Sequence, residues 1–185
     1  MKLLIRKYGD PALRLKGKAV AEVDSGIREL ADDMLETMRA ANGIGLAAQQ
    51  VGEALQLTAI DVSGAEDQES TLKLNGAEVD PKSSMPLLLL NPELTLNKET
   101  SLAIEGCLSF PEITADIRRA ISVVVRAQTL EGAPVEIEAS GLLARALQHE
   151  VDHLNGILFI DRMSAATKVA LRSRLKRMQK ENAPR

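Results

Sequence analysis

The chain has 185 residues, of which 45% are hydrophobic and 26% are charged, and its formal net charge is −3. These values are ordinary for a soluble globular protein, and we expect residues 1–185 to form a single domain with a sizeable core. The chain has one cysteine, which excludes an internal disulfide and fits a reducing compartment.

The N-terminus and the apolar runs argue against export and against membrane insertion. The apolar part of Met1–Arg6 is too short for a signal peptide. The longest apolar candidate, Leu87–Leu90, is far shorter than a membrane span. We therefore expect a cytoplasmic protein.

The first elements of the chain are predicted to be helical. Residues 9–14 read as a turn into a short helical stretch, because Pro11 suits a first helical position. An amphipathic helix is predicted over about 25–41, with Asp24 or Ser25 as its cap. Apolar residues keep helical spacing along it, at Ile27, Leu30, Met34, Leu35 and Met38.

The next stretch, Gly43–Gln50, begins after a helix breaker, Asn42-Gly43. Its glycines allow the backbone to approach a ligand closely. The stretch fits the loose dinucleotide pattern G-x-G-x-x-A, and Asp61 lies at the distance of a ribose-binding acid. That pattern needs a strand before the glycines and a helix after them. Here a helix precedes them and the alternating residues 55–62 predict a strand, which disfavours a dinucleotide cofactor.

The middle of the chain is predicted to form strands. Residues 63–86 are polar and read as a long loop or a hairpin excursion. We expect strands at Leu87–Leu90, ended by Asn91-Pro92, and again over 93–104. A hairpin over 121–128 and 134–139 is predicted to turn at Glu131-Gly132, and 157–160 reads as a short apolar strand or turn.

The stretch Gln148–His153 carries the strongest chemical signal. Two histidines four residues apart on a helix lie on one face, so His149 and His153 can reach one metal ion. Glu150 is close enough to handle a proton of a metal-bound water. We expect Ser140 to cap this helix and Asn155-Gly156 to end it.

The helix is predicted to turn its metal-binding face inward. Five apolar residues form one arc of the helix: Leu142, Leu143, Ala146, Leu147 and Leu154. His149, Glu150 and His153 fall within this arc or at its edge. Arg145, Gln148 and Asp152 are expected on the opposite, polar side. Ionisable groups in an interior need compensation, which a metal ion would supply.

Two other interpretations of this helix compete with a catalytic metal. The His-Glu-x-x-His spacing can arise by accident on an amphipathic helix whose histidines are satisfied in the core. A structural zinc site needs four protein ligands. The chain has only two histidines and one cysteine, so that site would have to recruit a carboxylate.

Glu105–Ser109 supplies the candidate third ligand. A free cysteine is more often a small buried hydrophobe than a ligand. Cys107, however, follows a glycine, and a thiolate with two imidazoles leaves a fourth position open, as in catalytic sites. Such a donor set suits zinc, iron, cobalt or nickel.

Together these three stretches resemble the peptide deformylase family, which is marked by G-x-G-x-A-A-x-Q, E-G-C-L-S and Q-H-E-x-D-H in this order. The resemblance implies an α+β fold in which antiparallel strands wrap around a central metal-binding helix, with an N-terminal and a C-terminal helix. It implies a single catalytic domain that removes the formyl group from the N-terminal formylmethionine of new polypeptides. Ferrous iron is the implied native ion.

The resemblance also implies a role for individual residues. Metal-bound hydroxide attacks the formyl carbon, with Glu150 as general base and then general acid. Gln50, rather than Gln49, and the backbone N–H of Leu108 stabilise the oxyanion. The other implied positions are the metal ligands Cys107, His149 and His153, the substrate contacts Gly43, Ile44, Gly45, Leu142 and Ala146, and the supporting pair Glu105 and Arg119.

Three positions depart from the family pattern. Thr114 stands where many members carry a basic residue, and Arg145 and Ala146 stand where more apolar residues often line the methionine pocket. A metallopeptidase using His-Glu-x-x-His is an alternative, but it needs a further ligand downstream. A non-catalytic, metal-stabilised binding protein is another.

The C-terminal segment separates charge sharply. Residues 162–185 hold eight Lys or Arg and one acid, leaving 15 basic and 25 acidic residues in the remainder. A helix is predicted over 165–180, with Leu171, Leu175 and Met178 on one side. Either it is a solvated helix docked on the core, or its charge holds the enzyme near the ribosome. Formylmethionyl nascent peptides are the expected partners; a membrane and DNA are not.

Overall fold

The computed structural model describes residues 1–65 and 69–183. Nine strands form a seven-stranded sheet in the order β1-β2-β5-β8-β9-β3-β4 and a two-stranded β6–β7 ribbon within the described residues. Every pairing between these strands is antiparallel. The strands are β1 (Gly45–Ala47), β2 (Leu57–Ile60), β3 (Ser70–Leu74), β4 (Ala77–Val79), β5 (Leu87–Leu96), β6 (Thr100–Gly106), β7 (Thr114–Ala120), β8 (Ser122–Gln128) and β9 (Pro134–Ser140).

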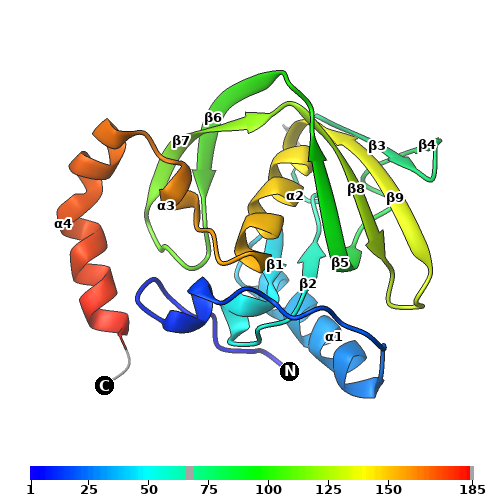
Figure 1. Cartoon of the computed structure of the whole chain (residues 1–185), viewed down its shortest axis with the longest axis horizontal. Coiled ribbons are helices and arrows are strands. Elements are labelled where there is room, and N and C mark those ends of the chain that lie inside the picture. Colours follow the sequence, from blue (N-terminus) through cyan, green and yellow to red (C-terminus); the bar gives the residue numbers. More distant parts are fainter. Residues whose placement is uncertain (66–68, 184–185) are drawn as a thin grey trace.

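Helix α2 lies at the centre of the molecule, between the larger sheet and the β6–β7 ribbon (Figure 1). This arrangement confirms the predicted α+β fold around a central helix. The helical elements are η1 (Pro11–Arg14), α1 (Ser25–Ala40), η2 (Ala48–Val51), α2 (Gly141–Leu154), α3 (Phe159–Arg162) and α4 (Ala165–Asn182). None of the helices in the described part of the chain is long and apolar enough to cross a membrane.

The N-terminal predictions are confirmed. The side chain of Asp10 accepts a hydrogen bond from the Ala12 amide at the start of η1. Asp24 caps α1 by accepting from the Ile27 amide. Helix α1 then buries Met34 and Met38 in an aliphatic cluster with β1 and β2.

Two strand predictions are wrong, and an asparagine lies at each of the two positions concerned. Strand β5 does not end at Asn91-Pro92. Asn91 has a left-handed φ of 51° and bonds the backbone of Val20 through its side chain, so it forms an irregularity within the strand. The β5–β8 register shifts between Leu90 and Glu93, and the strand continues to Leu96. The expected strand over 93–104 is broken at Asn97, whose side chain accepts from the Glu99 amide and turns the chain into β6.

The excursion at 63–86 is a hairpin in its described part, since β3 and β4 add to the sheet beside β9. Residues 66–68 lie outside the described residues. The predicted hairpin at 121–139 is confirmed as β8 and β9, with Gly132 at a φ of 81° in the turn. The expected strand or turn at 157–160 is instead the helical turn α3, which begins with the Asp161 carboxylate accepting from the Leu158 amide.

The polar face expected on helix α2 is wrong, because Gln148 and Asp152 on that face are buried. Gln148 and Asp152 are only 3% and 8% exposed. Gln148 exchanges two hydrogen bonds with the backbone of Ala120 on β7. Asp152 accepts from Arg119 and Arg162. Ser140 stands at the cap position of α2, but its hydroxyl bonds Thr71 instead of the helix.

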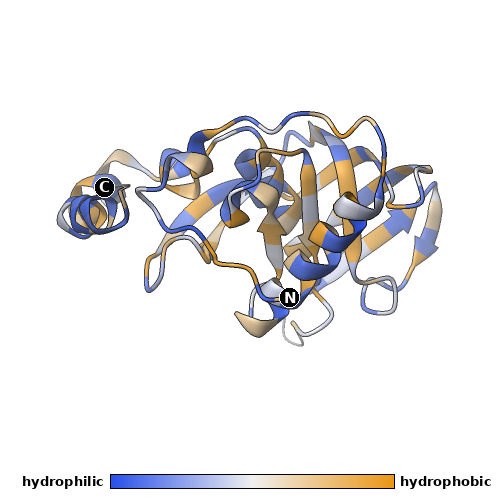
Figure 2. Cartoon of the chain, turned by 90° about the horizontal axis from the view of Figure 1, so that it is seen from below, coloured by the Kyte–Doolittle hydropathy of each residue, from blue (hydrophilic) through white to orange (hydrophobic). Residues whose placement is uncertain are grey.

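Helix α4 projects at one edge of the molecule (Figure 1), and hydrophilic residues cover most of it (Figure 2). None of its described residues is buried. Leu171, Leu175 and Met178, which the sequence predicted on one side of this helix, are half-buried against a cluster that contains Phe110 and Phe159.

Candidate metal centre

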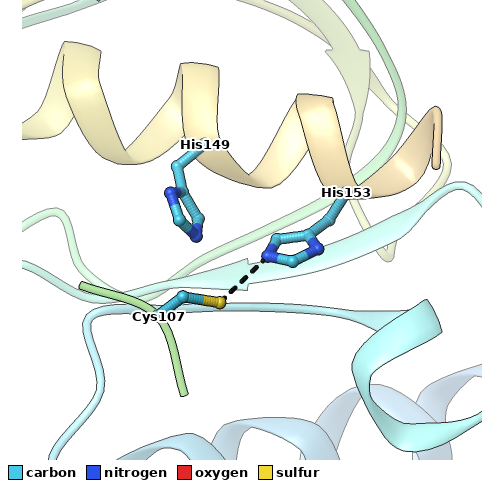
Figure 3. A group of neighbouring side chains, drawn as sticks. All are labelled: Cys107, His149 and His153. Carbon is cyan, nitrogen blue, oxygen red and sulfur yellow. Dashed lines mark hydrogen bonds between the residues drawn. The ribbon is translucent and has the colours of Figure 1, made fainter. Parts of the chain in front are cut away.

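The three predicted ligands meet in space. His149 and His153 lie one turn apart on α2, with ring centroids 4.9 Å apart. Cys107 follows the last residue of β6 and points toward both rings (Figure 3). The three ligand atoms lie within 4.8 Å of one another, and Cys107 Sγ is 3.3 Å from His153 Nε2.

This donor set fits a metal ion with an open coordination position. One sulfur and two imidazole nitrogens suit zinc or a later first-row transition metal. His149 Nδ1 lies 3.2 Å from Glu105 Oε2, an arrangement that fixes the ring orientation and leaves Nε2 for a metal. The residues present therefore fit the ion that the sequence implies.

Glu105 is held by an unusual number of partners. Arg119 donates to both of its oxygens, at 3.0 and 3.1 Å, and Arg145 donates to Oε1 at 3.1 Å. Burial raises the pKa of Glu105, but His149 and Arg119 outweigh it and bring the pKa down to about 2. Glu105 is thus a permanent carboxylate that supports His149. Sequence reasoning found Arg119 but missed Arg145 and Asp152, the second acceptor of Arg119.

Glu150 lies in a dry position beside the ligands. It is 3% exposed, and burial raises its pKa to about 7. Its Oε2 is buried without a hydrogen-bond partner among the described residues. Gly45 on β1 packs against this carboxylate so closely that a Cβ there would collide with it. A carboxyl group with such a pKa can accept and return a proton near neutral pH.

The two adjacent glutamines have different surroundings. Gln50 Oε1 accepts from the Ala47 amide, while its Nε2 donates to Ser109 Oγ and lies 3.6 Å from Cys107 Sγ. Gln49 turns away, toward the Leu154 carbonyl. The structure therefore brings Gln50, and not Gln49, to the candidate metal ligands.

A cavity of about 630 Å³ opens onto this centre. It is lined by all five predicted substrate contacts together with Gln50, Cys107, Leu108, His149 and Glu150. Lys7 and Ile104 also line it, and the sequence did not assign them there. Arg145 lines it as well, at the position where the resemblance places a residue of the methionine pocket. A second hollow of the same volume lies over β3, β8 and β9, but it contains none of the chemically distinctive residues.

Arg145 shows how a charged residue is accommodated in this wall. Its guanidinium donates to the carbonyl oxygens of Ala103 and Ile117, at 3.2 and 2.6 Å, besides Glu105. These bonds tie α2 to both strands of the ribbon. Long-range partners of this kind leave no sequence pattern, which is why helical periodicity alone placed Arg145 on the polar side of the helix.

Known proteins with similar sequences belong to the family that the motifs of this site predict. A family model described as polypeptide deformylase matches residues 2–169. The chain belongs to this family. It is 46% identical over 182 residues to the peptide deformylase of Opitutus terrae, covering 97% of this chain and 94% of that protein. It is 47% identical over 176 residues to that of Bartonella quintana, covering 94% and 92%.

Solved structures of deformylases share the fold. The peptide deformylase of Thermus thermophilus superposes with a TM-score of 0.81 at 37% identity, covering 97% of this chain and 99% of that one. The peptide deformylase of Thermotoga maritima gives a TM-score of 0.76 at 39% identity, covering 89% and 99%. The family predicted from three short motifs is therefore confirmed over nearly the whole chain.

Proposed function

We infer that this chain is a hydrolase that removes the formyl group from the N-terminal formylmethionine of newly made polypeptides. The observation that carries this inference is the juxtaposition of Cys107, His149 and His153 in a member of the deformylase family. Glu150 and Gln50 line the same cavity. That combination supports hydrolysis of a small amide at an open metal site.

We propose that the three ligands hold one divalent ion and that ferrous iron is the native one. Zinc, nickel and cobalt suit the same donor set. When bound, such an ion lowers the pKa of water and polarises a carbonyl group.

Glu150 handles the proton in this proposal. Its carboxylate takes a proton from the attacking water as the oxygen bonds to the formyl carbon. When the carbon–nitrogen bond breaks, Glu150 returns the proton to the leaving amine, and formate is released. The raised pKa of about 7 supports both directions of transfer.

Gln50 and Leu108 are proposed to stabilise the charge that develops on the formyl oxygen. The amide of Gln50 is oriented by its bond from the Ala47 N–H, which leaves Nε2 on the side of Cys107. The N–H of Leu108 belongs to the peptide unit directly after Cys107. Donors fixed in advance in a dry site contribute more than they would in water.

The methionine side chain is proposed to lie against Ile44, Leu142 and Ala146, with the backbone of Gly43 and Gly45 beside the peptide. These residues share one cavity. The guanidinium of Arg145 is committed to backbone carbonyls. Its aliphatic stem is then the part that remains to contact an apolar ligand.

One experiment separates this function from its alternatives. Protein prepared without oxygen is assayed for formate release from a short formyl-Met peptide, and metal content is measured on the same sample. Formate release without peptide cleavage supports a deformylase. Cleavage of internal peptide bonds would indicate a metallopeptidase, and bound metal without turnover would indicate a non-catalytic binding protein.

We also propose that α4 holds the enzyme near the ribosome. Its Lys and Arg side chains are exposed, while Leu171, Leu175 and Met178 dock on the body. A basic surface on an otherwise acidic protein is attracted to ribosomal RNA. A single catalytic domain and a cytoplasmic location remain predictions of the same kind.

A further inference from the structure

The N-terminal segment before η1 bridges the two segments that carry the proposed oxyanion donors. The Arg6 amide donates to the Gln50 carbonyl at 2.7 Å. Two residues later, the Tyr8 amide donates to the Ser109 carbonyl at 2.9 Å. Stacking of Tyr8 on Phe110, with centroids 4.8 Å apart, anchors the segment further.

Lys7 lies between these two backbone contacts and has an unusual environment. Its side chain is half-buried and lines the cavity. Its Nζ donates to the Leu108 carbonyl oxygen at 2.7 Å, and no carboxylate of the described residues lies within ion-pair distance. A partly desolvated ammonium without a carboxylate partner is costly, and its position at an active-site wall calls for a functional reason.

The contact of Lys7 completes the support of the residue whose N–H is the proposed oxyanion donor. The peptide unit before Leu108 is held because the Phe110 amide donates to the Cys107 carbonyl at 2.9 Å. The peptide unit after Leu108 is held by Lys7. Both carbonyls that flank the donor are therefore fixed, and only the second is fixed by a side chain that also carries charge.

We propose that Lys7 is a positioning residue for deformylation. By holding the Leu108 carbonyl it restrains the backbone of Leu108, so that the Leu108 N–H, whose own peptide unit the Phe110 amide holds, stays in place. It also places a positive charge on the wall where negative charge develops. This inference rests on the proposed function. The N-terminal segment then helps to stabilise the transition state and does not contribute to binding the peptide in the ground state.

The test compares Lys7→Met and Lys7→Arg with the wild-type enzyme, all loaded with the same metal without oxygen. The matched control is Lys16→Met, which removes one charge from an exposed side chain of the same N-terminal region. Rates of formate release from a formyl-Met peptide give kcat and KM separately. Because removal of a whole oxyanion donor costs 10²–10³ in kcat, loosening one should cost about tenfold.

We expect Lys7→Met to lower kcat about tenfold with KM within about twofold, because only transition-state contacts weaken. The kcat of Lys7→Arg should stay within about threefold of the wild-type value. The kcat of Lys16→Met should equal that of wild type. A raised KM at unchanged kcat would overturn the proposal, since Lys7 would then bind the peptide itself. An Arg variant as slow as the Met variant, or a Met variant as fast as wild type, would also overturn it.

A second measurement does not depend on activity. In metal-free protein, hydrogen exchange of the Phe110 amide reports on the segment that Lys7 holds. Lys7→Met should speed this exchange, and Lys16→Met should not; equal exchange in all proteins counts against the proposal. If wild type releases no formate with any metal, the proposed function fails, whereas faster exchange in Lys7→Met would still show that Lys7 orders this segment.

Discussion

His149 Nδ1 lies 3.2 Å from Glu105 Oε2, although 44 residues separate them in the chain. This contact selects which imidazole nitrogen remains for a metal ion. It also links the metal centre to two arginines, because Arg119 and Arg145 both donate to Glu105.

Glu105→Gln should weaken metal binding more than it weakens the fold. The amide keeps the shape of the carboxylate but loses the charge that orients His149, so we expect a loss of affinity of about 10- to 100-fold. Competition with a chelator measures it. The control is Glu93→Gln, at an exposed position of β5. Equal affinity in all three proteins would show that the contact does not tune the metal.

Cys107→Ala should abolish both tight metal binding and turnover. The sulfur is the only thiol of the chain, and the two histidines alone leave too few ligands for a stable site. Metal content after dialysis and formate release on the same sample test this. Stoichiometric metal with full turnover would rule out the proposed site.

Glu150→Gln should separate metal binding from catalysis. The side chain is assigned to proton transfer and not to coordination, so we expect normal metal content and a loss of turnover of about 10²–10⁴-fold. If the metal is lost together with the activity, Glu150 belongs among the ligands.

Glu150 should also leave a signature in the pH dependence of stability of the metal-free protein. Burial raises its pKa from 4.5 to about 7. At Glu150 the folded state therefore binds more protons than the unfolded state in this window, and the contribution of Glu150 to stability falls as pH rises from about 4.5 to about 7. Across this window the free energy of unfolding should lose roughly 3 kcal/mol through Glu150. Urea unfolding gives the free energy of unfolding of wild type and of Glu150→Gln at each pH. The difference between the two should change only within this window. If the two curves run parallel across the window, the pKa of Glu150 is not raised.

Basic residues of α4 should matter for ribosome binding and not for peptide turnover. Arg172, Lys176 and Lys180 are exposed. Replacing all three with Gln preserves the apolar contacts of the helix and removes three charges. Each lost phosphate contact should lower the salt slope of ribosome co-sedimentation by about 0.7 to 0.9, while release of formate from a short peptide stays unchanged.

The control for that variant replaces Lys16, Lys18 and Lys98, which are also exposed and lie outside α4. If both triple variants lose ribosome co-sedimentation to the same extent, binding depends on the net charge of the protein and not on α4. Unchanged co-sedimentation of the α4 variant would return this helix to a structural role.

The sequence by itself determined the local features of this protein. His149 and His153 share a face because four residues make about one helical turn, whatever surrounds the helix. Asp10 and Asp24 cap their helices through bonds to amides two and three residues away. Such contacts depend on neighbouring residues only, so patterns of a few letters suffice to predict them.

Only the tertiary structure decided how the centre is supported. Arg119 meets Asp152 across 33 residues and Arg145 meets Ala103 across 42, and neither pair has a spacing that a pattern can detect. The burial of Gln148 and Asp152 likewise followed from strands that surround α2 on the side expected to be polar. Lys7 reached the active-site wall for the same physical reason: long-range packing, and not local propensity, chooses which polar groups become neighbours.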